Sequence, residues 1–180
     1  SEAAPDASLA VNALTNQATE ENVKSSDFLL MKATVDPEQD LTADGKLKIS
    51  LSHAMSKLII KITVNGTTDA AMNKLGDMSI NGAVVNGICD LSATVPMVVP
   101  APDAVVATVA PYKGTESCEC ILPPQKIAEG FSVNFSYDGK LYIWTAKEAI
   151  ELEKGVEHTL TLNVNTTVRL ASKMARNWAT

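Results

Sequence analysis

The chain has 180 residues and a formal net charge of −6; 46% of its residues are hydrophobic and only 4% are aromatic. This length fits one domain with its own core, and the acidic balance argues against a nucleic-acid partner, which would need a basic surface. No apolar run reaches the roughly 18 residues that a membrane-spanning helix needs, so we expect no transmembrane segment. The abundance of Val, Ile, Thr and Ser favours strands and turns over long helices.

Residues 1–25 are polar and irregular, and we interpret them as an N-terminal extension or the remnant of a preceding domain. They lack the charged-then-apolar leader of a secretory signal, so this end neither indicates nor excludes secretion. One short alternating piece, "SLAVNAL", interrupts them. We assign residues 26–180 to a single β-sandwich domain.

Residues 46 to 64 carry a period-two pattern whose phase changes partway. His53 falls in phase with a first apolar set at odd positions, and a second apolar set follows at even positions. Side chains alternate strictly along a strand, so a bulge or tight jog is required between His53 and Leu58. We therefore predict that His53 lies at the edge of the core, where its ring bonds backbone groups freed by the break. The first set is Leu47, Ile49 and Leu51, and the second is Leu58, Ile60, Ile62 and Val64.

Turn signals separate several further strands. The pairs Asn81-Gly82 and Asn86-Gly87 favour tight hairpins, and Asp138-Gly139 separates the two strands of "FSVNFSYDGKLYIWTA". Prolines break residues 94–111, as suits edge strands and loops. A last strand has Leu160, Leu162 and Val164 on one face. Eight or more short strands with these turns predict an all-β fold, an antiparallel β-sandwich with Greek-key connections.

Reactive groups are few. Cys89, Cys118 and Cys120 leave at least one thiol unpaired, and we predict buried, inert thiols rather than a zinc site. The chain has two histidines, His53 and His158, and both fall at strand edges. The sequence contains no G-x-S-x-G, H-E-x-x-H or P-loop motif. We therefore expect no enzyme activity, no catalytic residues, no cofactor and no metal.

Tyr142 and Trp144 share one face of a predicted strand, opposite Leu141 and Ile143. Exposed rings stack on sugars, so these two residues are candidates for a surface contact. A surface carbohydrate-binding β-sandwich module is the alternative function that they indicate. Packing of the rings against a neighbouring strand or subunit is the competing interpretation.

Several segments, in order, resemble the fimbrillin-like proteins of Bacteroidales, the pilin and adhesin family of their surface fimbriae. The fragments extend from about Ser26 to Trp178, and their order is more specific than any one of them. His158 stands where the family usually has tyrosine, and the family's lipobox cysteine and most of its N-terminal domain are missing. The resemblance therefore covers mainly the C-terminal domain of the family. The segments are "SSDFLLMKA", "KISLSHAMSKLIIKITV", "LGDMSINGAVVNGICDLSATV", "CILPPQ" and "LEKGVEHTLTLNVNTTVRLASKMARNW".

The resemblance implies a transthyretin-like β-sandwich and a structural or adhesive fimbrial (pilus) subunit. It implies a lipoprotein precursor that is exported through the periplasm and becomes associated with the outer membrane at the cell surface. The implied partners are other fimbrial subunits, joined by β-strand exchange after proteolytic trimming, and a host or bacterial surface receptor. "SLAVNAL" and the C-terminal segment are candidate donor strands, unless both pack as ordinary strands of their own sandwich. We favour the C-terminal segment, with Val168, Leu170, Met174 and Trp178.

Overall fold

The structure is a computed structural model that describes residues 7–36, 38–67 and 72–165. It contains fifteen strands, one α-helix and one short 3-10 helix among these residues. In chain order the elements are β1 (Ser8–Asn12), α1 (Glu20–Ser26), β2 (Leu29–Leu30), β3 (Ser52–His53), β4 (Ser56–Val64), η1 (Met72–Lys74), β5 (Leu75–Val84), β6 (Asn86–Asp90), β7 (Val98–Pro100), β8 (Val106–Val109), β9 (Tyr112–Lys113), β10 (Cys118–Leu122), β11 (Gln125–Ile127), β12 (Ser132–Tyr137), β13 (Lys140–Thr145), β14 (Ile150–Leu152) and β15 (Glu157–Val164).

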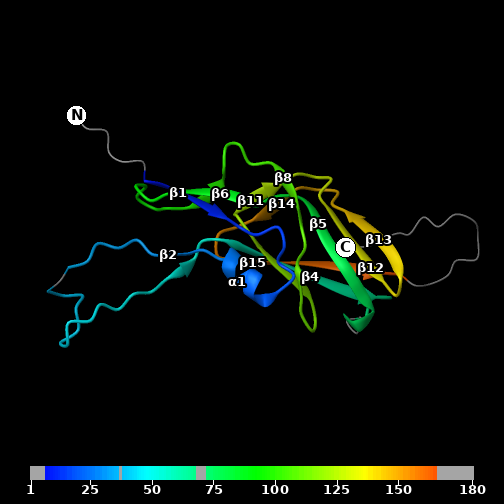
Figure 1. The fold of residues 1–180 in the computed structure, drawn as a ribbon, viewed down its shortest axis with the longest axis horizontal. Coiled ribbons are helices and arrows are strands. Elements are labelled where there is room, and N and C mark those ends of the chain that lie inside the picture. Colours follow the sequence, from blue (N-terminus) through cyan, green and yellow to red (C-terminus); the bar gives the residue numbers. More distant parts are fainter. Residues whose placement is uncertain (1–6, 37, 68–71, 166–180) are drawn as a thin grey trace, which may run out of the picture.

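Two four-stranded sheets form the body of the molecule (Figure 1). One has the order β15-β4-β10-β9 and the other has the order β13-β12-β5-β8. The strand pairs are antiparallel except that β15 runs parallel to β4. The all-β, antiparallel sandwich predicted from the sequence is confirmed with that one exception. The Greek-key connections and the transthyretin-like detail stay predictions.

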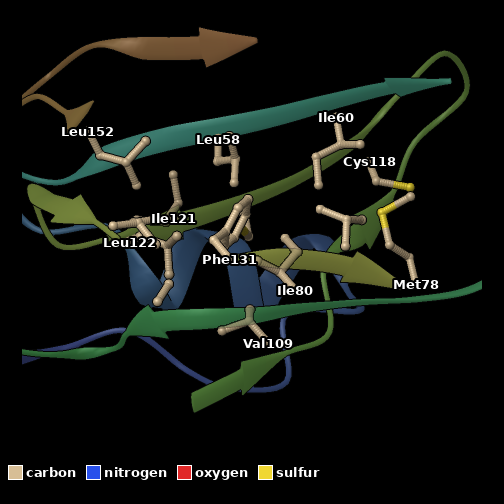
Figure 2. Close-up of a cluster of buried hydrophobic side chains, with 14 of the residues drawn as sticks. Leu58, Ile60, Met78, Ile80, Val109, Cys118, Ile121, Leu122, Phe131 and Leu152 are labelled. Atoms are coloured by element: carbon tan, nitrogen blue, oxygen red, sulfur yellow. The ribbon is translucent and has the colours of Figure 1, made fainter. Parts of the chain in front are cut away.

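The core lies between the two sheets. Leu58 and Ile60 of β4 point toward Ile80 of β5 and Val109 of β8, with Phe131 between the layers (Figure 2). All five side chains are at most 2% exposed. Burying an aliphatic or aromatic side chain of this size contributes about 1.5–3 kcal/mol relative to leaving it in water. The even-numbered apolar set of β4 is therefore on the core side, as its period predicts.

The N-terminal residues pack on the same body. β1 pairs antiparallel with β6, and Val11 and Val23 belong to the buried core. Thr19 caps α1 by accepting a hydrogen bond from the Asn22 amide at 3.2 Å. The piece "SLAVNAL" thus supplies a paired strand of its own molecule. The division of the chain at residue 25 stays a prediction.

The strand predicted at residues 46–51 is not part of a sheet. Residues 31–36 and 38–51, which we call the arm, leave the body between the two-residue strands β2 and β3, and they form the blue and cyan extension in Figure 1. Leu47, Ile49 and Leu51 are 37%, 61% and 56% exposed. The prediction that this apolar set faces the core is wrong. The pairing of β3 with β2 covers only Ser52 and His53, so the residues before Ser52 are not held against the body by it.

The Asn-Gly pairs behave differently from one another and from the prediction. Gly82 lies inside β5, where the register with β8 shifts between Asn81 and Ala83. It has a φ of +107°, and an added Cβ would lie 3.3 Å from the Cα of Phe131. Asn86 and Gly87 begin β6, so neither pair makes the expected hairpin turn. The Asp138-Gly139 turn does form, with φ angles of 50° and 72°.

Candidate assembly surface

The phase change in the sequence corresponds to a break between β3 and β4. Ala54, Met55 and Ser56 are buried one after another, which no regular strand allows on a one-sided sheet. The backbone groups at the break are satisfied by distant backbone. The Ala54 amide donates to the Phe28 carbonyl at 2.8 Å, and the Gly155 amide donates to the Met55 carbonyl at 2.8 Å.

His53 precedes this break and has a different partner from the one expected. Its Nδ1 lies 2.6 Å from Oδ2 of Asp27, and the side chains of His53 and Asp27 are 68% and 19% exposed. Asp27 is the C-cap residue of α1, so the pair connects the end of this helix to β3. The ring therefore bonds a carboxylate rather than the freed backbone groups, and it lies in solvent rather than at the edge of the core.

A depression of about 370 Å³ lies beside this pair, between α1, β4, β10 and the turn before β15. Lys57 is 2.8 Å from Glu119 and 3.5 Å from Glu157, and its hydrogen bond with Glu119 is the main cause that raises the pKa of Lys57. One ammonium group thus lies between two carboxylates. Within residues 7–36, 38–67 and 72–165, no three His, Cys, Asp or Glu side chains gather in a metal-binding group.

His158 also has a structural partner. Its Nε2 accepts a hydrogen bond from the Glu153 amide at 2.9 Å, which closes the turn between β14 and β15. An imidazole nitrogen that accepts from an amide is unprotonated. His53 thus connects β3 to the end of α1 and His158 closes a turn, so the two histidines do not share a site.

The cysteines are buried and free of disulfide bonds. Desolvation is the main cause that raises the pKa of Cys118 to about 11 and that of Cys120 to about 12. A raised pKa keeps these thiols protonated at neutral pH, which disfavours the thiolate form that acts as a nucleophile. The prediction that the three thiols are buried is confirmed, and their inertness stays a prediction.

Tyr142 and Trp144 are not surface residues. They are 7% and 6% exposed, and both pack in the core. The ring of Tyr142 stacks on Phe135 with centroids 5.7 Å apart, and Trp144 meets Phe131 edge-on at 6.0 Å. The expected surface contact at these two residues is therefore wrong, and packing against a neighbouring strand is what they do.

The opposite face of the same strand carries the exposed apolar residues. Leu141 is 82% exposed and Ile143 is 62% exposed. Among the described strands, β13 has a partner on one side only, which is β12. Its other edge has no strand partner among the described residues, and the outer face of the strand exposes Leu141 and Ile143, with Lys140 as the only charged residue of the strand. We define the candidate assembly surface as this open edge with Leu141 and Ile143.

The sequence holds a signal for this surface that alternation alone does not reveal. A two-residue turn at Asp138-Gly139 fixes the register of the hairpin, so Phe135 must pair with Tyr142. Because Phe135 belongs to the inward apolar set of its strand, Tyr142 must face inward as well. The residues predicted to form a donor strand, Val168, Leu170, Met174 and Trp178, lie outside the described residues.

The profile of a protein family matches residues 1–178, almost the whole chain, and its description is fimbrillin-like. This chain belongs to the fimbrillin-like family. No curated protein matches the sequence. Among the described residues of this fimbrillin-like chain, no helix combines the length and the hydrophobicity required to cross a bilayer.

Two solved structures share the fold of this fimbrillin-like chain. A candidate cell adhesion protein from Bacteroides uniformis aligns with 91% of this chain and 63% of its own, at a TM-score of 0.65 and 16% identity. A candidate cell adhesion protein from Bacteroides ovatus aligns with 91% of this chain and 56% of its own, at a TM-score of 0.58 and 20% identity. The chain therefore spans less than two thirds of either solved relative.

Proposed function

We propose that this chain is a non-enzymatic structural or adhesive subunit of a cell-surface fimbria. The observation that carries the proposal is the match of the fimbrillin-like family to residues 1–178. The solved relatives described as candidate cell adhesion proteins support the adhesive part of this role. The histidines and cysteines also support a non-enzymatic role, because the histidines make contacts that hold the fold together and the cysteines are buried.

The open edge of β13 supports an assembly role. Natural edge strands usually carry charges, prolines or bulges that block pairing with another chain. β13 carries one charge, on its first residue Lys140; it has no proline or bulge in its six-residue pairing with β12, and it exposes Leu141 and Ile143. An added strand gains main-chain hydrogen bonds along such an edge and specificity from alternate side chains.

The finer part of the proposal concerns how subunits join. We infer that a C-terminal strand containing Val168, Leu170, Met174 and Trp178 is donated to a neighbouring fimbrial subunit. The chain reaches the cell surface as a lipoprotein precursor that is exported through the periplasm and held at the outer membrane. A host or bacterial surface molecule is the receptor of the adhesive role. Membership of the fimbrillin-like family and the strand architecture support these proposals.

The carbohydrate-binding alternative has lost its supporting observation. It depended on rings that sugars could stack on, and Tyr142 and Trp144 are buried instead. We therefore retain the fimbrial role alone.

Deletion of residues 167–180 tests the donor strand. The shortened chain should keep a folded core, judged by its circular dichroism and thermal transition, and should fail to enter fimbriae on the cell surface. A matched control keeps the length and composition of residues 167–180 but scrambles their order, which should fail in the same way. Normal incorporation of either variant would refute the donor assignment.

A further inference from the structure

The turn between β14 and β15 is closed by a side chain of the strand that follows it. The Glu153 amide donates to Nε2 of His158 at 2.9 Å, and the Glu153 carbonyl accepts from the Val156 amide at 3.3 Å. β14 belongs to the small sheet with β11, whereas β15 is the parallel edge strand of a main sheet. The turn thus carries the chain from one sheet to the other, and the imidazole of His158 fixes its first residue.

The hydrogen bond between Glu153 and His158 exists in only one charge state of the ring. Nε2 accepts from an amide while it carries no proton, and both ring nitrogens are donors in the imidazolium. Protonation therefore sets the Nε2–H group against the Glu153 N–H group, and two donors cannot bond each other. Histidine ordinarily changes its charge between about pH 5 and about pH 8. Mild acid is thus sufficient to remove this bond.

No ion pair holds His158 in either charge state among the described residues. Lys57 of β4 is next to Leu58, the residue paired with His158, but its ammonium group lies between two carboxylates. In the turn, the ammonium group of Lys154 donates to a backbone carbonyl at 3.3 Å. The charge of the ring can therefore follow the pH of the solution. The carboxylates on these elements and on the adjacent strand β10 are Glu119, Glu151, Glu153 and Glu157.

The turn packs closely on the backbone where β3 ends and β4 begins. The Gly155 amide donates to the Met55 carbonyl at 2.8 Å. A Cβ added to Gly155 would lie 3.1 Å from the carbonyl oxygen of His53, so there is little free space between the turn and this backbone. The Val156 carbonyl accepts from the Lys57 amide at 3.0 Å. The turn also forms one wall of the depression beside α1, so its position sets the shape of that wall.

We propose that the β14–β15 turn is a pH-sensitive latch, which is closed while His158 is neutral and loosened when its ring is protonated. Loss of the bond to Nε2 frees the Glu153 amide, and the turn then moves away from the backbone of Met55. The wall of the depression that the turn forms opens as a result. β15 keeps its pairing with β4 from Thr159 to Val164, so the change is local. The latch goes beyond the proposed fimbrial role and does not depend on it.

Another wall of the depression keeps its contacts in acid. His53 and Asp27, which line it, are connected through Nδ1 of the ring and Oδ2 of the carboxylate, which lie 2.6 Å apart. A protonated ring still donates from Nδ1, and a charge-assisted hydrogen bond is stronger than a neutral one. Protonation therefore has opposite effects on the contacts of the two histidines, and α1 stays attached to β3 while the turn loosens.

Amide exchange in the full chain, measured by NMR at about pH 7.5 and about pH 5.5, tests the latch. After correction for the intrinsic dependence of exchange on pH, the protection of the Glu153 and Gly155 amides should fall roughly two- to tenfold in acid, the equivalent of one ordinary hydrogen bond. The midpoint of this decrease should coincide with the titration of the His158 ring, followed by the signals of its carbon-bound protons. The amide of Ile60, in the middle of β4, should keep its protection.

His158→Gln removes the charge change, because a glutamine oxygen can accept from the Glu153 amide at every pH. Protection in this variant should be the same at both pH values, whereas the matched control His53→Gln should retain the decrease seen in the unmodified chain. Equal protection of the unmodified chain at both pH values would overturn the latch. So would a decrease that persists in His158→Gln, or one whose midpoint follows the titration of His53 instead of His158. The comparison of midpoints uses the unmodified chain, so it does not depend on the folding of either variant.

Discussion

The side-chain amide of Gln17 makes the two hydrogen bonds to the backbone of Ile121 that a neighbouring strand would otherwise make. Oε1 of Gln17 accepts from the Ile121 amide at 2.8 Å, and Nε2 donates to the Ile121 carbonyl at 2.8 Å. Nε2 also donates to the carbonyl of Leu14 at 2.9 Å, and the side chain of Gln17 is fully buried. One glutamine thus attaches the N-terminal segment to β10, a hundred residues away in the chain.

Gln17→Met should destabilise the protein by about 3 kcal/mol, because it leaves two buried backbone groups of Ile121 without partners. Urea denaturation measures the loss. Gln39→Met is the matched control, since Gln39 is exposed on the arm and its substitution should have little effect. Equal stability of the two variants would contradict the role given to Gln17.

Trp144→Ala should destabilise by about 3–5 kcal/mol, the usual cost of removing a large aromatic side chain from a core. Its neighbour Ile143 is exposed, so Ile143→Ala should change the free energy of unfolding by less than about 0.5 kcal/mol. Chemical denaturation of the two variants makes the comparison. If Ile143→Ala destabilised the protein more than Trp144→Ala, the assignment of the buried and exposed faces of β13 would be inverted.

The stability of the protein should fall in alkaline solution. The pKa values of Cys118 and Cys120 are raised from 9.0 to about 11 and about 12, so these thiols ionise more readily in the unfolded chain. Their contribution is fully present below pH 9.0 and is lost as the pH rises through the folded-state values. The double variant Cys118→Ala/Cys120→Ala should show a smaller decrease in the free energy of unfolding above pH 9.0. The same alkaline decrease in both proteins would exclude the thiols as its source.

His53→Ala should lower stability by less than about 1 kcal/mol, because the His53–Asp27 pair is partly exposed. A double-mutant cycle with Asp27→Asn isolates the coupling between the two side chains. The variant should enter fimbriae normally, since the pair only connects α1 to β3. Loss of incorporation in a stable, folded His53→Ala protein would show that the histidine has a further role.

Local patterns predicted the parts of the fold that local rules govern. The Asp138-Gly139 turn and the buried face of β4 follow directly from backbone preferences and period-two alternation. The parallel pairing of β15 with β4 depends on chain segments about a hundred residues apart, and no local signal specifies it. The bonds of Gln17 to Ile121 are of the same kind, because nothing around a polar glutamine shows that it will be buried.

The arm shows where period alone misleads. Alternation at Leu47, Ile49 and Leu51 predicted a strand that faces the core, but among the described residues this segment joins no sheet and its aliphatic side chains are exposed. Likewise, alternation in β13 defined two faces without indicating which one is buried, and the cross-strand register was needed to decide. The candidate assembly surface could therefore be found from the sequence only by following the hairpin pairing from Phe135 to Tyr142.

Immunogold electron microscopy of cells that express the chain, with mass spectrometry of the sheared surface fibres, tests the central claim most directly. We predict gold label on the fibres and the chain as a stoichiometric component of the sheared fraction. Recovery of the chain only outside the fibres, from cells whose fimbriae are intact, would contradict its role as a fimbrial subunit.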